Sequence, residues 1–196
     1  MIPQIPESSL VHRKLPVNGK QSYIPYSTED GLVPPMAIAG QGYYFHLTGL
    51  THDERGYPTM TAAAQDRLAT RLVDKIRLNV DDIVTYEEFM TDDAEIVVVA
   101  YGITSRIARF AVKLAREQGI KAGLLQLVTL WPFAEKRVRE LASRTKRFVV
   151  AEINRGQMVY EVERCACGKA ATVLVPHSGG DVHRPEAIMA ALRESR

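Results

Sequence analysis

Residues 95–106, EIVVVAYGITSR, decide how the second half of the chain folds. The apolar, largely β-branched run predicts a strand over 95–100 that is covered on both faces, as in a parallel sheet flanked by helices. Gly102 gives the next turn a freedom that a Cβ would deny it, and Thr104 or Ser105 is expected to cap the following helix. The stretch therefore predicts one strand–turn–helix unit of an α/β fold.

The same order of elements repeats to the C-terminus. Four strands that alternate with helices predict a three-layer αβα fold with a mostly parallel, doubly wound sheet and right-handed crossovers. Ligands of such sheets bind at the carboxyl ends of the strands. The further expected elements are helix 105–118 ended by Gly119, strand 121–128, a helix opened by Trp131-Pro132-Phe133 and running to 144, strand 148–153, helix 157–166, strand 172–175, loop 177–184 and helix 185–194.

Residues 1–60 have a different character, because they hold seven of the ten prolines. That density argues against regular helices. The segment is also rich in Tyr, Phe and Leu, in which disordered linkers are poor. We expect an extended arm that is buried, either against the following domain or in a domain that this chain does not contain.

A helix and linker are expected over 61–93, before the α/β domain of 94–196. Thr61 is placed to cap the helix. Leu68, Leu72, Val73 and Ile76 form the apolar stripe of an amphipathic helix that ends near residue 78. Its arginines and lysines are expected on the solvated side, and residues 79–91 read as a connection.

The loop 49–56 is the first candidate site. Two glycines bracket a run of titratable residues, which suits a ligand-binding loop and equally a solvated turn. A metal site is not predicted, because His52, Asp53 and Glu54 are adjacent and have no second His or Cys near them in the sequence.

The turn 101–106 is the second candidate. Gly102, Thr104, Ser105 and Arg106 are placed to hold an anion at a helix N-terminus, with the arginine as counter-charge; the alternative is a simple capped helix start. The three glycines of the dinucleotide fingerprint are absent. The turns 152–157 and 178–181 are weaker candidates.

No set of catalytic residues can be assembled from the sequence. Cys165 is expected to be a packed thiol, and it lies too close to Cys167 for an unstrained disulfide, which fits a reducing compartment such as the cytoplasm. Two cysteines cannot hold an iron–sulfur cluster, which needs four.

Composition excludes two classes of partner. The formal net charge is +2, from 25 basic and 23 acidic residues, and no Lys/Arg block gives a nucleic-acid footprint. No apolar run approaches the ~18 residues of a membrane span, and the N-terminus lacks a signal pattern. We therefore expect a cytoplasmic protein with no nucleic-acid or membrane partner.

Several motifs resemble one enzyme family. The arm is similar to the latter part of the α subunit of 2-oxoacid:ferredoxin oxidoreductases, most closely the 2-oxoglutarate type. The rest resembles that subunit's following domain, which is of the transketolase C-terminal kind. The motifs are YIPY (23–26), DGLVPP (30–35), AIAG (37–40), TGLTHDERG (48–56), AYG (100–102), LWPF (130–133), EIN (152–154), GQ (156–157) and GG (179–180).

The resemblance implies a role in coenzyme A-dependent oxidative decarboxylation of a 2-oxoacid, with electrons passing to ferredoxin. It implies thiamine diphosphate, Mg and an iron–sulfur cluster in the complex, held mainly outside this chain. The implied partners are the β subunit, ferredoxin through the complex, and a second copy of the chain. Thr48, His52, Asp53, Glu54 and Arg55 match the family's loop and are expected to face substrate or partner.

The thiamine-facing domain of such α subunits, with its Tyr-Pro-Ile-Thr-Pro motif, is missing from this sequence. We therefore expect the isolated chain to be inactive and to be one piece of a larger subunit. Two alternatives stay open. One is the interface domain of another thiamine enzyme, such as a transketolase or the β subunit of a 2-oxoacid dehydrogenase. The other is a stand-alone small-ligand binder that uses the turn 101–106.

Overall fold

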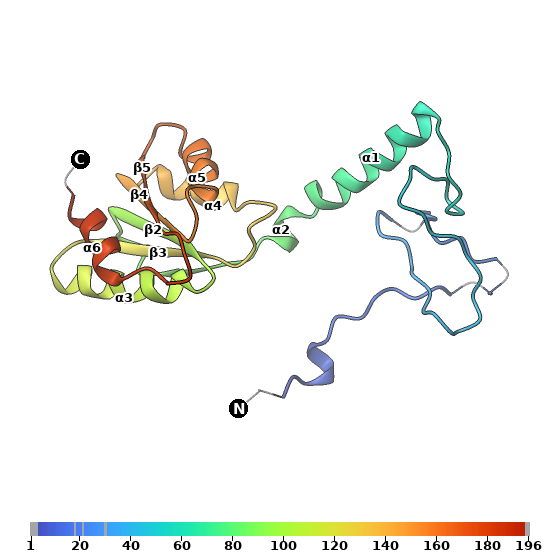
Figure 1. The fold of residues 1–196 in the computed structure, drawn as a ribbon, viewed down its shortest axis with the longest axis horizontal. Coiled ribbons are helices and arrows are strands. Elements are labelled where there is room, and N and C mark those ends of the chain that lie inside the picture. Colours follow the sequence, from blue (N-terminus) through green and yellow to red (C-terminus); the bar gives the residue numbers. More distant parts are fainter. Residues whose placement is uncertain (1–3, 18, 21, 30, 195–196) are drawn as a thin grey trace. The chain divides into compact units, whose positions relative to one another are not determined.

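A computed structural model describes residues 4–17, 19–20, 22–29 and 31–194 (Figure 1). The chain divides into two compact units between Asn79 and Val80. Helix α1 (Ala62–Arg77) thus belongs with the arm, whereas the short α2 (Val80–Ile83) belongs with the sheet. Each unit is described by itself.

The second unit is built on a five-stranded sheet in the order β1-β3-β2-β4-β5. The pairs β2–β3, β2–β4 and β4–β5 are parallel, and only β1 is antiparallel, against β3. The expected mostly parallel sheet is confirmed. Its strands are β1 (Tyr86–Phe89), β2 (Ile96–Tyr101), β3 (Ala122–Leu127), β4 (Arg147–Glu152) and β5 (Ala171–Pro176).

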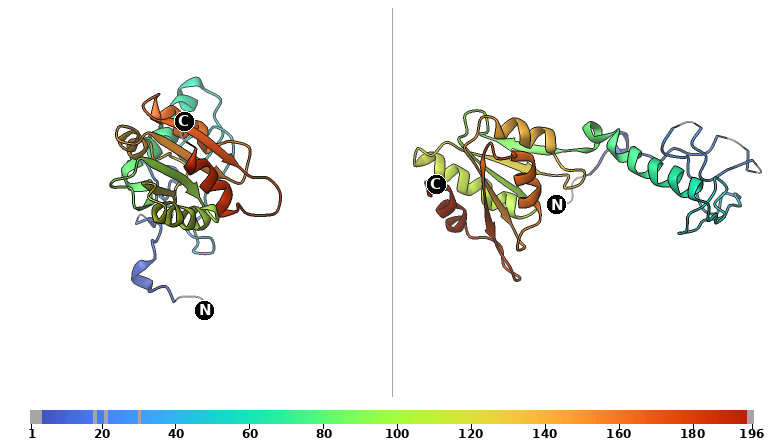
Figure 2. Two further views of the ribbon diagram at one scale, coloured as in Figure 1. Left: turned by 90° about the vertical axis from the view of Figure 1, so that its left-hand side faces the viewer. Right: turned by 90° about the horizontal axis from the view of Figure 1, so that it is seen from above.

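Two pairs of helices cover the two faces of this sheet (Figures 1 and 2). Helices α3 (Thr104–Glu117) and α6 (Pro185–Arg193) close one core cluster with the side chains of Val98 and Val149. Helices α4 (Glu135–Ala142) and α5 (Met158–Ala166) close the other, with Val97, Val99 and Val150. Successive residues of β2 and β4 pack into opposite clusters, because successive side chains of a strand point to opposite faces of the sheet. The three-layer αβα class is confirmed.

Strand β1 was not predicted, and the expected count of four strands is wrong. Its sequence, YEEF, is short and half acidic, and it lies at the sheet edge with Tyr86, Glu87 and Glu88 exposed to solvent or nearly so. Such a segment lacks the apolar run that reveals an inner strand. An ion pair holds this edge to helix α4, since Arg137 Nη2 lies 2.9 Å from Glu88 Oε1.

One predicted helix cap and one predicted helix start are also wrong. Ile103 precedes helix α3 with helical backbone angles, and neither Thr104 nor Ser105 makes a capping bond, because both side chains are buried in the first turn. Helix α4 begins at Glu135 rather than at Trp131–Phe133. Phe133 is instead drawn into the core before the helix starts.

The first unit is held together by aromatic side chains and contains little regular structure. Apart from α1, its described residues form only the 3₁₀ turn Glu7–Ser9 and an isolated antiparallel bridge between His52 and Pro58. The hydroxyl of Tyr23 donates to the carbonyl of Pro35 and accepts from the backbone N–H of Ala37, each at 3.1 Å. The rings of Tyr43 and Phe45 meet Tyr23 edge-on. These contacts fold the arm back on itself.

Helix α1 starts where the sequence predicts, because Thr61 Oγ1 accepts the backbone N–H of Ala64 at 3.2 Å. Its apolar stripe, by contrast, is left largely uncovered: Leu72 and Val73 are each 43% exposed. Elsewhere in the unit Val11, Tyr44 and Met60 are almost fully exposed. Exposed apolar side chains mark an interaction surface where they form a contiguous patch, whereas single ones are normal on a protein surface.

None of the described helices combines the length and hydrophobicity that crossing a membrane demands.

Candidate functional site

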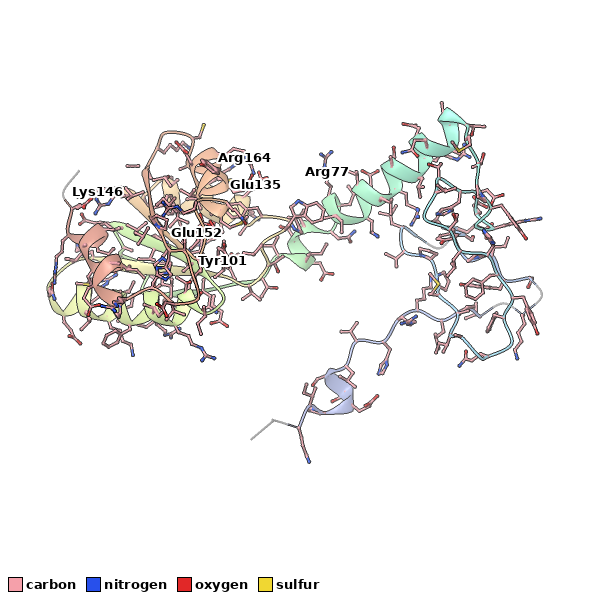
Figure 3. All side chains as sticks on the ribbon, viewed as in Figure 1. Arg77, Tyr101, Glu135, Lys146, Glu152 and Arg164 are labelled. Carbon is pink, nitrogen blue, oxygen red and sulfur yellow. The ribbon has the colours of Figure 1, made fainter. Side chains whose placement is uncertain are left out.

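The carboxyl edge of the sheet carries a polar network at the point where ligands of doubly wound sheets bind. Strand β2 pairs with β3 on one side and with β4 on the other. The connection that follows β2 therefore runs to one side of the sheet and the connection that follows β4 runs to the other, so the strand order reverses between β2 and β4. Tyr101 ends β2 and Glu152 ends β4. Figure 3 shows the two side chains at this edge.

Glu152 is fully buried and accepts hydrogen bonds from five groups. Three are the backbone N–H groups that begin helix α5 and would otherwise lack a partner. The other two are side chains, which also bond to each other: Asn154 Nδ2 donates to the Tyr101 hydroxyl at 2.8 Å. The donors to the carboxylate are Gln157 N (3.1 Å), Met158 N (3.0 Å), Val159 N (3.1 Å), Tyr101 Oη (3.1 Å) and Asn154 Nδ2 (3.1 Å).

These bonds fix the charge of the network. Burial by itself pushes the pKa of Glu152 upward, but the N–H donors of the α5 N-terminus and the Asn154 amide outweigh it and hold the pKa below its ordinary value of 4.5. Burial raises the pKa of Tyr101, and the neighbouring Glu152 charge raises it further. The site therefore holds a carboxylate and a neutral phenol at neutral pH.

An incoming anion has no place at the N-terminus of α5, because Glu152 already occupies it. The predicted anion-binding turn lies at the start of α3. Gly102 and Arg106 are exposed there, whereas Thr104 and Ser105 are 2% and 1% exposed. Two of the four predicted residues are thus exposed to solvent and two are buried. The anion site stays a prediction.

The loop of the first unit is a tight hairpin. The backbone N–H of Asp53 donates to the carbonyl of Tyr57, and that of Thr59 donates to Thr51, each at 2.9 Å. Asp53 Oδ1 accepts the backbone N–H groups of Arg55 and Tyr57, again at 2.9 Å. A carboxylate that closes a turn in this way has a structural task, as is common for Asp in turns.

The hairpin is docked against the arm through His52 and Glu54. The His52 ring packs on the Tyr26 ring with centroids 3.9 Å apart, and its Nδ1 donates to the Asp53 carbonyl at 2.8 Å. The backbone N–H of Tyr26 in turn donates to the Glu54 carbonyl at 3.0 Å. The contact uses the backbone of Glu54, whose side chain is exposed.

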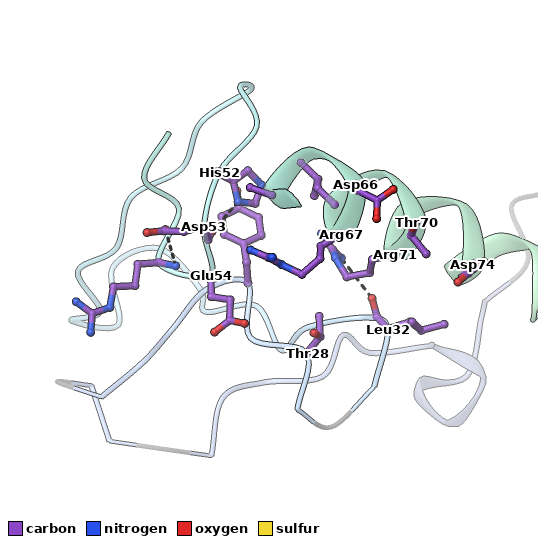
Figure 4. Close-up of a pocket in the computed structure, with 14 residues that line it drawn as sticks. Thr28, Leu32, His52, Asp53, Glu54, Asp66, Arg67, Thr70, Arg71 and Asp74 are labelled. Atoms are coloured by element: carbon purple, nitrogen blue, oxygen red, sulfur yellow. Dashed lines mark hydrogen bonds between the residues drawn. The ribbon is translucent and has the colours of Figure 1, made fainter. Parts of the chain in front are cut away.

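A pocket of about 600 Å³ lies between this hairpin and helix α1 (Figure 4). Four of the five predicted loop residues line it, and Thr48 does not: its Oγ1 accepts the backbone N–H of Leu50 within its own turn. The pocket also has lining residues that the sequence assigned to a solvated helix face. These are Arg67 and Arg71, of which Arg71 donates to the Leu32 carbonyl at 3.3 Å. The lining mixes both signs of charge.

The amino-acid sequence of the sheet domain matches a known protein family. Residues 94–188 match the family described as pyruvate:ferredoxin oxidoreductase core domain II. The α/β domain belongs to this family. The matched range runs from the turn before β2 into α6, so it covers the four parallel strands and the Glu152 network.

Relatives of the oxidoreductase family match more of the chain. A 2-oxoglutarate synthase subunit KorA of Methanothermobacter thermautotrophicus is 45% identical over 90% of this chain and 47% of its own length. The KorA subunit of Methanocaldococcus jannaschii is also 45% identical, over 93% of this chain and 49% of its own length. The resemblance to the α subunit of a 2-oxoacid:ferredoxin oxidoreductase is confirmed. The chain spans about half the length of these curated relatives.

A solved structure is similar in fold over nearly the whole chain, arm included. The 2-oxoglutarate:ferredoxin oxidoreductase of Magnetococcus marinus, solved with 2-oxoglutarate, coenzyme A and succinyl-CoA bound, aligns with a TM-score of 0.78. The alignment covers 98% of this chain and 34% of that one, at 21% identity. At that identity the likeness concerns the fold alone.

The cysteines lie as the sequence predicts. Cys165 and Cys167 are both free, and Cys165, which lies on α5, is buried in the core cluster that also contains residues of α4. Burial raises the pKa of the Cys165 thiol, which makes it a poor nucleophile.

Proposed function

We propose that this chain is the C-terminal portion of the α subunit of a 2-oxoglutarate:ferredoxin oxidoreductase, and that it serves structure and subunit contact rather than chemistry. In the assembled enzyme the reaction would be coenzyme A-dependent oxidative decarboxylation of the 2-oxoacid, with electrons passing to ferredoxin. The observation that carries the proposal is the 45% identity to KorA subunits over 90% of the chain but only 47% of their length.

The sheet domain supports a structural role. At the edge where a ligand is expected, the one buried carboxylate already has five donors, and it therefore has no free lone pair with which to act as a base. Among the described residues no group of three or more His, Cys, Asp or Glu side chains is arranged to hold a metal ion.

An iron–sulfur cluster does not fit this chain. Its two cysteines fall short of the four that an iron–sulfur cluster needs. We assign the cluster to the β subunit, and the resemblance to the family places thiamine diphosphate and its Mg ion mainly outside this chain as well. The pocket residues His52, Asp53, Glu54 and Arg55, together with Thr48, would then face substrate or a partner chain.

We infer the substrate from the length of the chain that matches each relative. A ketoisovalerate oxidoreductase subunit VorB of Methanothermobacter thermautotrophicus is 47% identical, but over 57% of this chain against 90% for KorA. The longer match includes the arm, so we favour 2-oxoglutarate. A branched 2-oxoacid is the second candidate.

The partner surface is the apolar stripe of helix α1. We expect the chain purified from its own cells to carry with it a polypeptide that supplies the rest of the α subunit and an iron–sulfur β subunit, both identified by mass spectrometry. Leu72→Glu places a charge in the stripe and should reduce that recovery at least about tenfold, because a charge without a partner would be buried on association.

Ala63→Glu is the matched control. Ala63 is exposed on the opposite side of α1, so the same charge there should leave recovery unchanged. Recovery with lipoyl proteins would instead indicate a 2-oxoacid dehydrogenase, and equal recovery of the two variants would show that the stripe is not the contact.

A further inference from the structure

The loop between β5 and α6 brings two histidines together. The rings of His177 and His183 have centroids 5.2 Å apart and planes inclined at 48°. Between them in the sequence lie Ser178, two glycines, Asp181 and Val182. Glycines allow the chain to reverse tightly enough for the two rings to meet.

The tautomer of His183 is fixed by its surroundings. His183 is 3% exposed, and its Nε2 lies 2.9 Å from the carbonyl oxygen of Val175. A carbonyl only accepts, so Nε2 carries the proton and Nδ1 holds a lone pair. That Nδ1 is buried and has no hydrogen-bond partner.

His177 offers a second ring nitrogen without a partner. Its backbone N–H donates to the carbonyl of Glu152 at 3.0 Å, which places the residue at the carboxyl end of β4. Its ring Nε2 is buried without a partner. Two buried imidazole nitrogens without partners in one loop carry a desolvation cost that a bound group would remove.

The separation of the two rings suits a shared transition-metal ion. A histidine that binds a metal through one ring nitrogen ordinarily donates the other N–H to a backbone carbonyl or carboxylate, which is the arrangement of His183. A tetrahedral zinc ion at ~2.1 Å from each nitrogen places the two ring centres roughly 5 Å apart. The observed 5.2 Å agrees with that spacing.

We propose that His177 Nε2 and His183 Nδ1 together bind a divalent transition-metal ion of the zinc, nickel or copper class. Since the described residues offer no third His, Cys, Asp or Glu ligand there, water completes the coordination. The ion would fasten the loop 177–184 to the ends of β4 and β5. This proposal concerns residues that the proposed oxidoreductase role does not use, and it stands or falls independently of that role.

The test is a titration of Zn²⁺ into the full chain without an affinity tag, in a Cys167→Ser background that removes the exposed thiol. Calorimetry should show one ion bound per chain. His177→Ala should weaken binding at least about tenfold, the scale set by loss of a metal-site group. His183→Gln should do the same, because its amide N–H still reaches the Val175 carbonyl while the Nδ1 lone pair is lost.

Controls separate this site from other histidines. His46→Ala removes a ring that stacks on Tyr57 in the first unit and should leave the affinity unchanged. In NMR spectra of the histidine side chains, Zn²⁺ should shift the His177 and His183 signals. Without added metal, the two variants should have the same unfolding temperature as the parent chain. If Zn²⁺ does not bind, or if His177→Ala and His183→Gln bind it like the parent, the proposal is wrong.

Discussion

Glu152→Ala is expected to lower the free energy of unfolding of the sheet unit by about 3 kcal/mol or more, since each buried donor left without a partner costs ~1–3 kcal/mol. The substitution strips the carboxylate from three backbone N–H groups of α5 and from two side chains, Tyr101 and Asn154. It also leaves a void at a fully buried position. Chemical denaturation followed by circular dichroism measures the change.

Glu152→Gln tests the charge separately from the shape. The amide keeps one acceptor oxygen but turns its NH₂ toward groups that also donate, so we expect a loss of about 2 kcal/mol at neutral pH. The pKa of Glu152 in the folded chain lies below its ordinary value of 4.5. Its contribution is therefore complete above that value and is lost as the pH falls through the folded pKa.

The stability difference between wild type and Glu152→Gln should accordingly shrink as the pH falls below 4.5, when the carboxylate of the wild type takes up its proton. Glu163→Ala is the control, because Glu163 is exposed on the same helix α5 and should change stability by less than ~0.5 kcal/mol. A loss of similar size for Glu152→Ala and Glu163→Ala would show that the network does not hold the turn.

Gly56→Ala should open the hairpin of the first unit. Gly56 has φ +89°, and a Cβ built there would overlap the carbonyl oxygen of His46, a backbone atom that cannot move aside alone. A left-handed residue with a side chain costs about 1–2 kcal/mol even without a clash. We expect the amides of Asp53 and Thr59, which close the hairpin, to exchange with solvent at least about tenfold faster, since each 1.4 kcal/mol is a factor of ten.

Gly40→Ala separates the clash from the backbone strain. Gly40 also has a positive φ, +84°, but a Cβ there meets nothing within 4 Å. It should therefore leave the Asp53 and Thr59 amides as slow as in wild type. If Gly56→Ala preserves their protection as well, the contact with His46 does not shape the loop.

The sheet could be predicted from the sequence because β2 and β4 lie in the middle of it. Their residues are buried on both faces, so they appear as unbroken apolar runs. Strand β1 could not be found in the same way, because its two glutamates face water or an arginine at the edge. The sequence of a half-polar edge strand looks like that of a loop, because it lacks an apolar run.

The site residues show the same limit. Sequence reasoning named the turn 152–157 only as a weaker candidate site, and the structure shows that the side chains of Glu152 and Asn154 hold this turn by hydrogen bonds. Thr104 and Ser105 looked like caps because they begin a helix, but packing turned them inward. The sequence signal for Glu152 was a charged residue that ends a buried apolar run shortly before a helix begins.

Contacts between distant segments left no local signal. Arg67 and Arg71 have the spacing of a solvated helix face, and only the docking of the hairpin on α1 places them in a pocket. His177 and His183 are polar residues in a glycine-containing loop, and only the folded chain shows that they meet. Such placements depend on the tertiary fold rather than on periodicity.

The central claim is that this chain supports an oxidoreductase whose reacting groups lie elsewhere. A chimeric α subunit makes the claim testable: the matched part of KorA from Methanothermobacter thermautotrophicus is replaced by this chain and expressed with the other subunits of that enzyme. Transfer of electrons from 2-oxoglutarate to ferredoxin, with coenzyme A present, is then compared between the chimera and the chain alone. We predict turnover by the chimeric complex and none by the isolated chain; turnover by the isolated chain, or an assembled chimera without activity, would contradict the account.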